Sequence, residues 1–91
     1  MSALLTESEI ATALEGLPDW RLEGGEIVRT FTFRNFVESV EFVNRVTEIA
    51  EEANHHPDVD IRWNKVTLHL STHSRGGLTA ADFALAARLH A

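Results

Sequence analysis

Three stretches of the chain repeat apolar residues at helical spacing, and each one follows a residue that can cap a helix. The first follows Thr6, whose hydroxyl can accept from backbone N–H groups while Glu9 reaches back in a capping box. The second follows Asn35 and ends before a proline. The third follows Thr79, with Asp82 at the capping-box position. The pattern predicts three helices, of which the middle one is the longest.

Between these helices, apolar and polar residues alternate with a period of two, which is typical of strands with one buried face. Gly24-Gly25 and Asn64-Lys65 have the composition of tight turns that join strands into hairpins. The predicted strands cover residues 20–22, 27–33, 58–63 and 66–71.

The predicted element order is α-β-β-α-β-β-α within one domain of residues 1–91. Hairpins make antiparallel neighbours, and the apolar face of the sheet must be covered by helices. The sequence therefore predicts an α+β fold of two layers. A four-stranded antiparallel sheet carries all three helices on one face.

Helical periodicity also predicts which faces are buried. In the long helix the expected inner face comprises Phe36, Val40, Val43, Val46, Thr47, Ala50 and Ala53. In the last helix, Leu85 and Leu89 lie off the face that carries Phe83 and Ala86. They are expected to form a second stripe that a subunit interface would cover.

Composition and charge narrow the classes of function. The chain is 44% hydrophobic and 24% charged, which is ordinary for a globular protein. Its net charge of −6 disfavours nucleic acid as a partner. Without cysteine it has no disulfide, thiolate metal site or cysteine nucleophile. No apolar run is long enough to span a membrane and no secretory signal is recognisable, so we expect a cytoplasmic protein.

Histidines are the candidate chemical groups. His55 lies at the expected end of the long helix, where the helix dipole favours the imidazolium form. Glu51 precedes it by four residues and could support it, which suits a histidine that donates a proton. Two other interpretations are open: His55 and His56 could simply satisfy the last helical carbonyls, or with His73 they could bind zinc. His69 has the pattern of an ordinary strand residue.

The spacing of these residues is more specific than any of them alone. Three residues separate Glu51 from His55-His56-Pro57. Five residues separate Pro57 from Trp63, nine separate Trp63 from His73, and eight separate His73 from Asp82. This pattern, with its flanking Trp63-Asn64-Lys65-Val66 and Leu70-Ser71-Thr72-His73 segments, resembles the pterin-4a-carbinolamine dehydratases. The resemblance covers almost the whole chain.

The resemblance implies that the protein removes water from 4a-hydroxytetrahydropterin to give the quinonoid dihydropterin, with no metal or redox cofactor. By similarity, His55 would be the general acid, supported by Glu51. His73 would be the opposing base, or an acid for the other stereoisomer, and His56 would hold the pterin ring. Two further motif positions, Trp63 and Asp82, are expected to contribute to substrate binding.

The resemblance also implies a homodimer or homotetramer whose partner is a small-molecule pterin. It leaves an alternative open, because some proteins similar to this family act as non-catalytic binding modules or scaffolds. The three histidines of this sequence favour catalysis, whereas an exposed Leu85–Leu89 stripe would suit a binding module.

Overall fold

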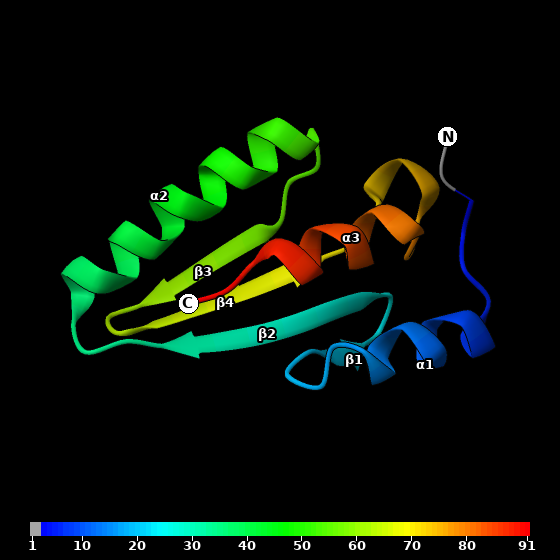
Figure 1. Cartoon of the computed structure of the whole chain (residues 1–91), viewed down its shortest axis with the longest axis horizontal. Coiled ribbons are helices and arrows are strands. Elements are labelled where there is room, and N and C mark those ends of the chain that lie inside the picture. Colours follow the sequence, from blue (N-terminus) through cyan, green and yellow to red (C-terminus); the bar gives the residue numbers. More distant parts are fainter. Residues whose placement is uncertain (1–2) are drawn as a thin grey trace.

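A four-stranded antiparallel sheet forms one layer of the protein (Figure 1). The structure is a computed structural model, and it describes residues 3–91. The strands lie in the spatial order β1-β2-β4-β3, so β4 is central and β3 is an edge strand. Their bounds are β1 (Arg21–Glu23), β2 (Glu26–Thr32), β3 (Asp58–Arg62) and β4 (Lys65–Leu70).

Three helices form the second layer: α1 (Glu7–Glu15), α2 (Phe36–Ala53) and α3 (Ala80–Arg88). The capping boxes predicted at Thr6 and Thr79 are both present, and the Asn35 side chain caps α2. Arg34 donates to the Glu38 carboxylate from its backbone N–H and its guanidinium, which lowers the pKa of Glu38. The predicted α+β class and element order are confirmed, with one addition, the single 3₁₀ turn η1 (His73–Arg75).

The core lies between the helices and one face of the sheet. The sheet contributes five buried side chains from β2 and β4, and these are Ile27, Phe31, Val66, Leu68 and Leu70. The ring of Phe42 in α2 packs at a tilt against those of Phe31 and Phe33, with ring centroids 4.5 and 5.1 Å away. Because aromatic contacts of this kind bury large apolar areas, they fix how α2 lies on the sheet.

The predicted inner face of α2 is partly wrong. The buried residues are Ser39, Phe42, Val46 and Ala50, whereas Phe36, Thr47 and Ala53 are exposed. The observed stripe keeps the 3–4–4 spacing of a helix, but it is rotated toward Phe42. Burying Phe42 removes more apolar surface from water than burying Thr47 and Ala53 would.

The prediction for α3 is also wrong in one respect. Leu85 and Leu89 are fully buried in the core of the same chain, together with Ala86. With Asp82 they form the inward stripe of α3, because residues three or four apart share one helix face. They therefore offer no exposed apolar stripe to a partner.

The turn between β3 and β4 is shifted by one residue from its predicted position. It is formed by Trp63 and Asn64, and Trp63 has a left-handed backbone with φ of 52°. Asn64 exchanges hydrogen bonds with the backbone of Phe33, at 2.7 Å and 3.1 Å. Because both hydrogen bonds of Asn64 are made to the backbone of Phe33, they hold this turn against the end of β2.

No helix of the described chain is long and apolar enough to cross a membrane.

Candidate active site

Four chain segments meet at one end of the molecule: the end of α2, the start of β3, the segment after β4 and the start of α3. Asn54 ends α2 in the left-handed conformation with φ of 51°, and the next N–H, of His55, closes on the Ala50 carbonyl at 3.1 Å. This is a common way to terminate a helix. The chain turns sharply here, so the side chain of His55 is no longer one helical turn above Glu51.

His55 is held by a buried carboxylate. Its Nε2 lies 2.5 Å from Oδ1 of Asp82, and the side chains are 17% and 0% exposed. Oδ2 of Asp82 accepts the backbone N–H of Thr79 at 2.9 Å and the hydroxyl of Thr72 at 2.8 Å. Asp82 thereby connects the end of α2, the segment after β4 and the start of α3. With Nε2 directed at Asp82, Nδ1 is the ring atom of His55 left for other chemistry.

Glu51 pairs with His56, not with His55 as predicted. Oε2 of Glu51 lies 2.5 Å from Nε2 of His56, and these side chains are 69% and 56% exposed. The left-handed Asn54 explains the exchange, because it turns His55 toward α3 and brings His56 back over the last turn of α2.

His73 opens the 3₁₀ turn η1 and lies near the start of β3. Its Nε2 is 3.8 Å from Oδ2 of Asp58, and both side chains are well exposed. The backbone of Thr72 closes on Gly77, with the N–H of Thr72 donating to its carbonyl at 2.8 Å. This closed loop places His73 beside the segment that carries His55 and His56. The structure therefore brings all three predicted histidine positions to one end of the fold.

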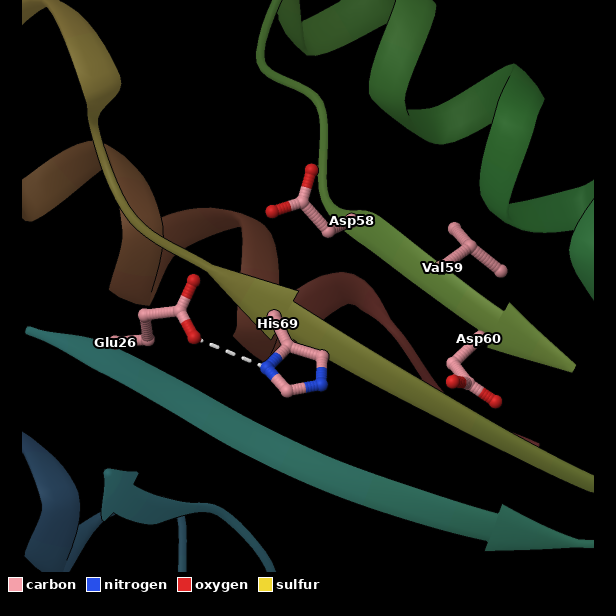
Figure 2. Close-up of a pocket in the computed structure, with 5 residues that line it drawn as sticks. All are labelled: Glu26, Asp58, Val59, Asp60 and His69. Carbon is pink, nitrogen blue, oxygen red and sulfur yellow. Dashed lines mark hydrogen bonds and ion pairs between the residues drawn. The ribbon is translucent and has the colours of Figure 1, made fainter. Parts of the chain in front are cut away.

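A hollow of about 290 Å³ lies on the face of the sheet that no helix covers, and Figure 2 shows its lining residues. It is lined by Glu26 of β2, His69 of β4, and Asp58, Val59 and Asp60 of β3. Nδ1 of His69 lies 3.0 Å from Oε1 of Glu26, and both side chains are half-buried. Asp58 belongs both to this hollow and to the ion pair with His73.

The sequence interpretation treated His69 as an ordinary strand residue and did not consider Glu26. The missing information was the register, in which Val28 and Asp58 both lie opposite His69. Glu26 is on the same face as Val28, two residues earlier. Strand parity alone places His69 on the polar face, but only the pairing shows which carboxylates lie beside it.

Two predicted substrate-binding residues are not placed to touch a ligand at the histidines. Asp82 has no exposed surface, and its two carboxylate oxygens already contact His55, Thr72 and Thr79. Trp63 follows Asp58 by five residues of nearly extended chain, so it lies about 16 Å away at the other end of β3. Its side chain is exposed there.

A three-histidine metal site is not formed. Over residues 3–91, no three or more His, Asp or Glu side chains are arranged to hold a metal ion. Each of the three histidines instead faces a carboxylate of its own.

The fold and site define a small α+β protein with three histidine–carboxylate pairs where the end of α2, the start of β3 and the start of α3 come together. A sequence model of the family described as "Pterin 4 alpha carbinolamine dehydratase" matches residues 3–91. The chain belongs to this family. This confirms the resemblance found in the sequence.

Similar proteins extend over nearly the whole chain. A Chloroflexus aurantiacus protein named "Putative pterin-4-alpha-carbinolamine dehydratase" is 56% identical over 85 residues, covering 93% of this chain and 91% of that protein. A Nocardia farcinica protein of the same name is 54% identical, covering 94% and 90%. These names support membership of the dehydratase family.

Two solved structures share the fold. A transcriptional coactivator/pterin dehydratase from Brucella melitensis superposes with a TM-score of 0.88 at 35% identity, covering 94% of each chain. A pterin dehydratase-like protein, identified as a RuBisCO assembly factor in the alpha-carboxysome, gives a TM-score of 0.66 at 24% identity, covering 78% of this chain and 84% of that one. The second likeness shows the fold alone.

Proposed function

We propose that this protein is an enzyme that dehydrates 4a-hydroxytetrahydropterin to the quinonoid dihydropterin by histidine acid–base catalysis. The family supports the pterin substrate. The observation that carries the mechanism is the contact between His55 and the buried carboxylate of Asp82. A carboxylate bound to one ring nitrogen fixes the tautomer of a histidine and stabilises its imidazolium.

His55 is the general acid of this proposal. With Nε2–H directed at Asp82, Nδ1–H of the imidazolium delivers its proton to the 4a-hydroxyl as the C4a–O bond breaks. The hydroxyl leaves as water, and the electron pair on N5 forms the C4a=N5 bond. Acid catalysis is needed because hydroxide is a poor leaving group, and such help is worth about 10² to 10⁴ in rate.

His73 then accepts the proton that N5 loses. Its exposed imidazole lies 3.8 Å from Asp58, a lining residue of the hollow, and in this proposal the pterin ring occupies that hollow on the sheet face. At about 290 Å³ its volume is near the lower end of the range for small-molecule sites. His56, steadied by Glu51, holds the ring from the α2 side. Asp82 acts through His55 as a positioning residue.

The test is a dehydration assay on freshly prepared 4a-carbinolamine with matched variants of one residue. In His55→Gln the side-chain amide can still donate to Asp82 but has no proton to deliver. We expect a folded protein whose rate falls by about 10² to 10⁴. The control is Glu48→Gln on the exposed side of α2, which should keep the full rate. A His55→Gln protein with an undiminished rate would refute the assignment.

The binding-module alternative has lost its main sequence argument, since Leu85 and Leu89 are buried. We retain a homodimer or homotetramer, a cytoplasmic location and a single functional domain over residues 1–91 as predictions. Exposed apolar side chains at Phe36, Val37, Val59, Ile61 and Trp63 are the candidates for a subunit contact. Sedimentation equilibrium of the wild type measures the state of assembly directly.

A further inference from the structure

Thr72 directly precedes His73, at the point where the segment after β4 enters the turn η1. It occupies the N-cap position of this turn, where a threonine hydroxyl commonly accepts from the N–H groups of the turn that follows. In η1, all of whose residues the structure describes, the Thr72 hydroxyl caps no N–H group. The side chain is directed away from its own turn, so it serves a group elsewhere in the fold.

That group is the buried carboxylate of Asp82. Oγ1 of Thr72 lies 2.8 Å from Oδ2 of Asp82 and also 2.8 Å from Oγ1 of Thr79. Thr72 has a single hydroxyl proton, and an ionised carboxylate only accepts, so the Thr79 hydroxyl donates to Thr72. The three side chains therefore form a hydrogen-bonded chain with one direction, and Thr79 and Asp82 have no exposed surface.

This chain fixes the rotation of the Asp82 carboxylate. Oδ2 accepts from the Thr72 hydroxyl at 2.8 Å and from the Thr79 N–H at 2.9 Å, which leaves Oδ1 for His55. Without the Thr72 hydroxyl, only the backbone of Thr79 would hold Oδ2, and the carboxylate could turn about its Cβ–Cγ bond. The direction of the His55 ring therefore depends on Thr72, with Asp82 standing between them.

The backbone of Thr72 holds the other proposed catalytic histidine. Its N–H donates to the Gly77 carbonyl at 2.8 Å. Its carbonyl accepts from the N–H groups of Arg75 and Gly76, at 2.9 and 3.0 Å. These bonds close the loop that begins with His73. The side chain of Thr72 thus supports one side of the proposed site, and its main chain supports the other.

We propose that Thr72 is a positioning residue that sets the separation between the proposed acid, His55, and the proposed base, His73. Such a role rests on the proposed dehydratase function and adds a residue that does not touch the substrate. The oxygen on C4a and the neighbouring N5 are fixed by the pterin ring, so the two imidazoles must keep a matching distance. A displacement of about 1 Å can lower turnover by about 10². Because Thr72 makes no contact with the pterin in this arrangement, its hydroxyl should matter for kcat more than for KM.

The experiment is a dehydration assay on freshly prepared 4a-carbinolamine with two variants of Thr72. Thr72→Val keeps the size and loses the hydroxyl, and we expect kcat to fall about tenfold to a hundredfold with KM within about threefold. Thr72→Ser keeps the hydroxyl and should retain kcat within about threefold. The matched control is Thr30→Val, which removes a hydroxyl from the 2.9 Å pair of Thr30 and Thr67 between β2 and β4. It should keep the full rate.

A second measurement separates this role from the proposed function. The imidazole nitrogen signals of His55 in a long-range ¹H–¹⁵N spectrum, assigned with His55→Gln, report the environment of its ring. Thr72→Val should displace or broaden these signals, whereas Thr72→Ser and Thr30→Val should leave them unchanged. A wild type without dehydration activity would refute the proposed function, and the spectra alone would then decide whether Thr72 positions His55.

Three results would overturn the proposal: a wild-type kcat in Thr72→Val, equal losses of kcat in Thr72→Val and Thr72→Ser, or unchanged His55 signals in Thr72→Val. Circular dichroism establishes that each variant is folded. Thr72→Ala, which also lacks the hydroxyl, replaces Thr72→Val if the valine variant does not fold.

Discussion

The pair between His55 and Asp82 and the pair between His56 and Glu51 have the same chemistry and the same 2.5 Å separation. Their surroundings differ. The first joins two elements far apart in the sequence, and its carboxylate is completely buried. The second joins neighbours on one turn of chain in solvent. A third pair, between His73 and Asp58, is longer and also exposed.

The comparison shows that contact distance alone does not measure what such a pair contributes. In solvent, the gain from an ion pair is offset by hydration, side-chain entropy and screening. Inside the protein, removing one partner leaves a charge or a hydrogen-bonding group that nothing else can satisfy. The buried pair should therefore govern both stability and the position of His55, and the exposed pairs should adjust only local chemistry.

The largest expected effect follows removal of the buried carboxylate. Asp82→Ala leaves the ring nitrogen of His55 and the N–H of Thr79 without a partner, and leaves the Thr72 hydroxyl with only the Thr79 hydroxyl. We expect the free energy of unfolding to fall by about 3 kcal/mol, measured by urea denaturation at neutral pH. Asp82→Asn keeps the size of the side chain and should lose less. An Asp82→Ala protein as stable as wild type would break the comparison.

Coupling energies should separate the two pairs next. A double-mutant cycle on His55 and Asp82 should give a coupling of about 1–3 kcal/mol in unfolding free energy. The matching cycle on His56 and Glu51 should give about 0.2–1 kcal/mol. Both cycles use Gln at the histidine and Asn or Gln at the acid. Equal couplings would show that burial does not distinguish the pairs.

Salt should distinguish the pairs kinetically. Glu51→Gln is expected to lower kcat/KM less than tenfold, because Glu51 steadies His56 only from solvent. This loss of kcat/KM in Glu51→Gln should be smaller in 1 M NaCl, where the Debye length falls to about 3 Å. The deficit of Asp82→Asn should persist at that salt concentration. Dehydration rates of the three proteins at low and high salt measure this, and a salt-insensitive Glu51→Gln deficit would contradict it.

The smallest effect is expected at the third pair. Asp58→Asn should change the free energy of unfolding by less than about 0.5 kcal/mol, because both groups of the pair are exposed and 3.8 Å apart. Thermal unfolding of this variant beside the wild type measures the change. A loss above about 1 kcal/mol would mean that Asp58 supports the sheet through contacts other than His73.

Local signals in the sequence were sufficient for much of the fold. The capping boxes at Thr6 and Thr79 and the turn at Gly24-Gly25 depend on neighbouring residues, and all three occur in the structure. Gly24 has φ of 58°, a conformation that few other residues adopt without strain. Where a few adjacent side chains decide the backbone, the sequence is enough.

Predictions that depend on packing were less successful. The periodicity of α2 permits two adjacent inward faces, and only the place of Phe42 against Phe31 selects between them. The partner of Glu51 depends on one residue, Asn54, which leaves the helical conformation and redirects the two histidines. For the same reason the spacing identified the three histidines but not which carboxylate each one faces.

Asp82 both caps α3 and contacts His55, and this has a consequence for how the protein folds. Its carboxylate closes the first turn of α3 and also contacts His55, so the native start of the last helix also positions the proposed general acid. Shortening the chain from its C-terminal end removes Leu89 and then Leu85 from the core, so turnover and stability should be lost together. During refolding, activity should return together with the docking of this final segment and not before it.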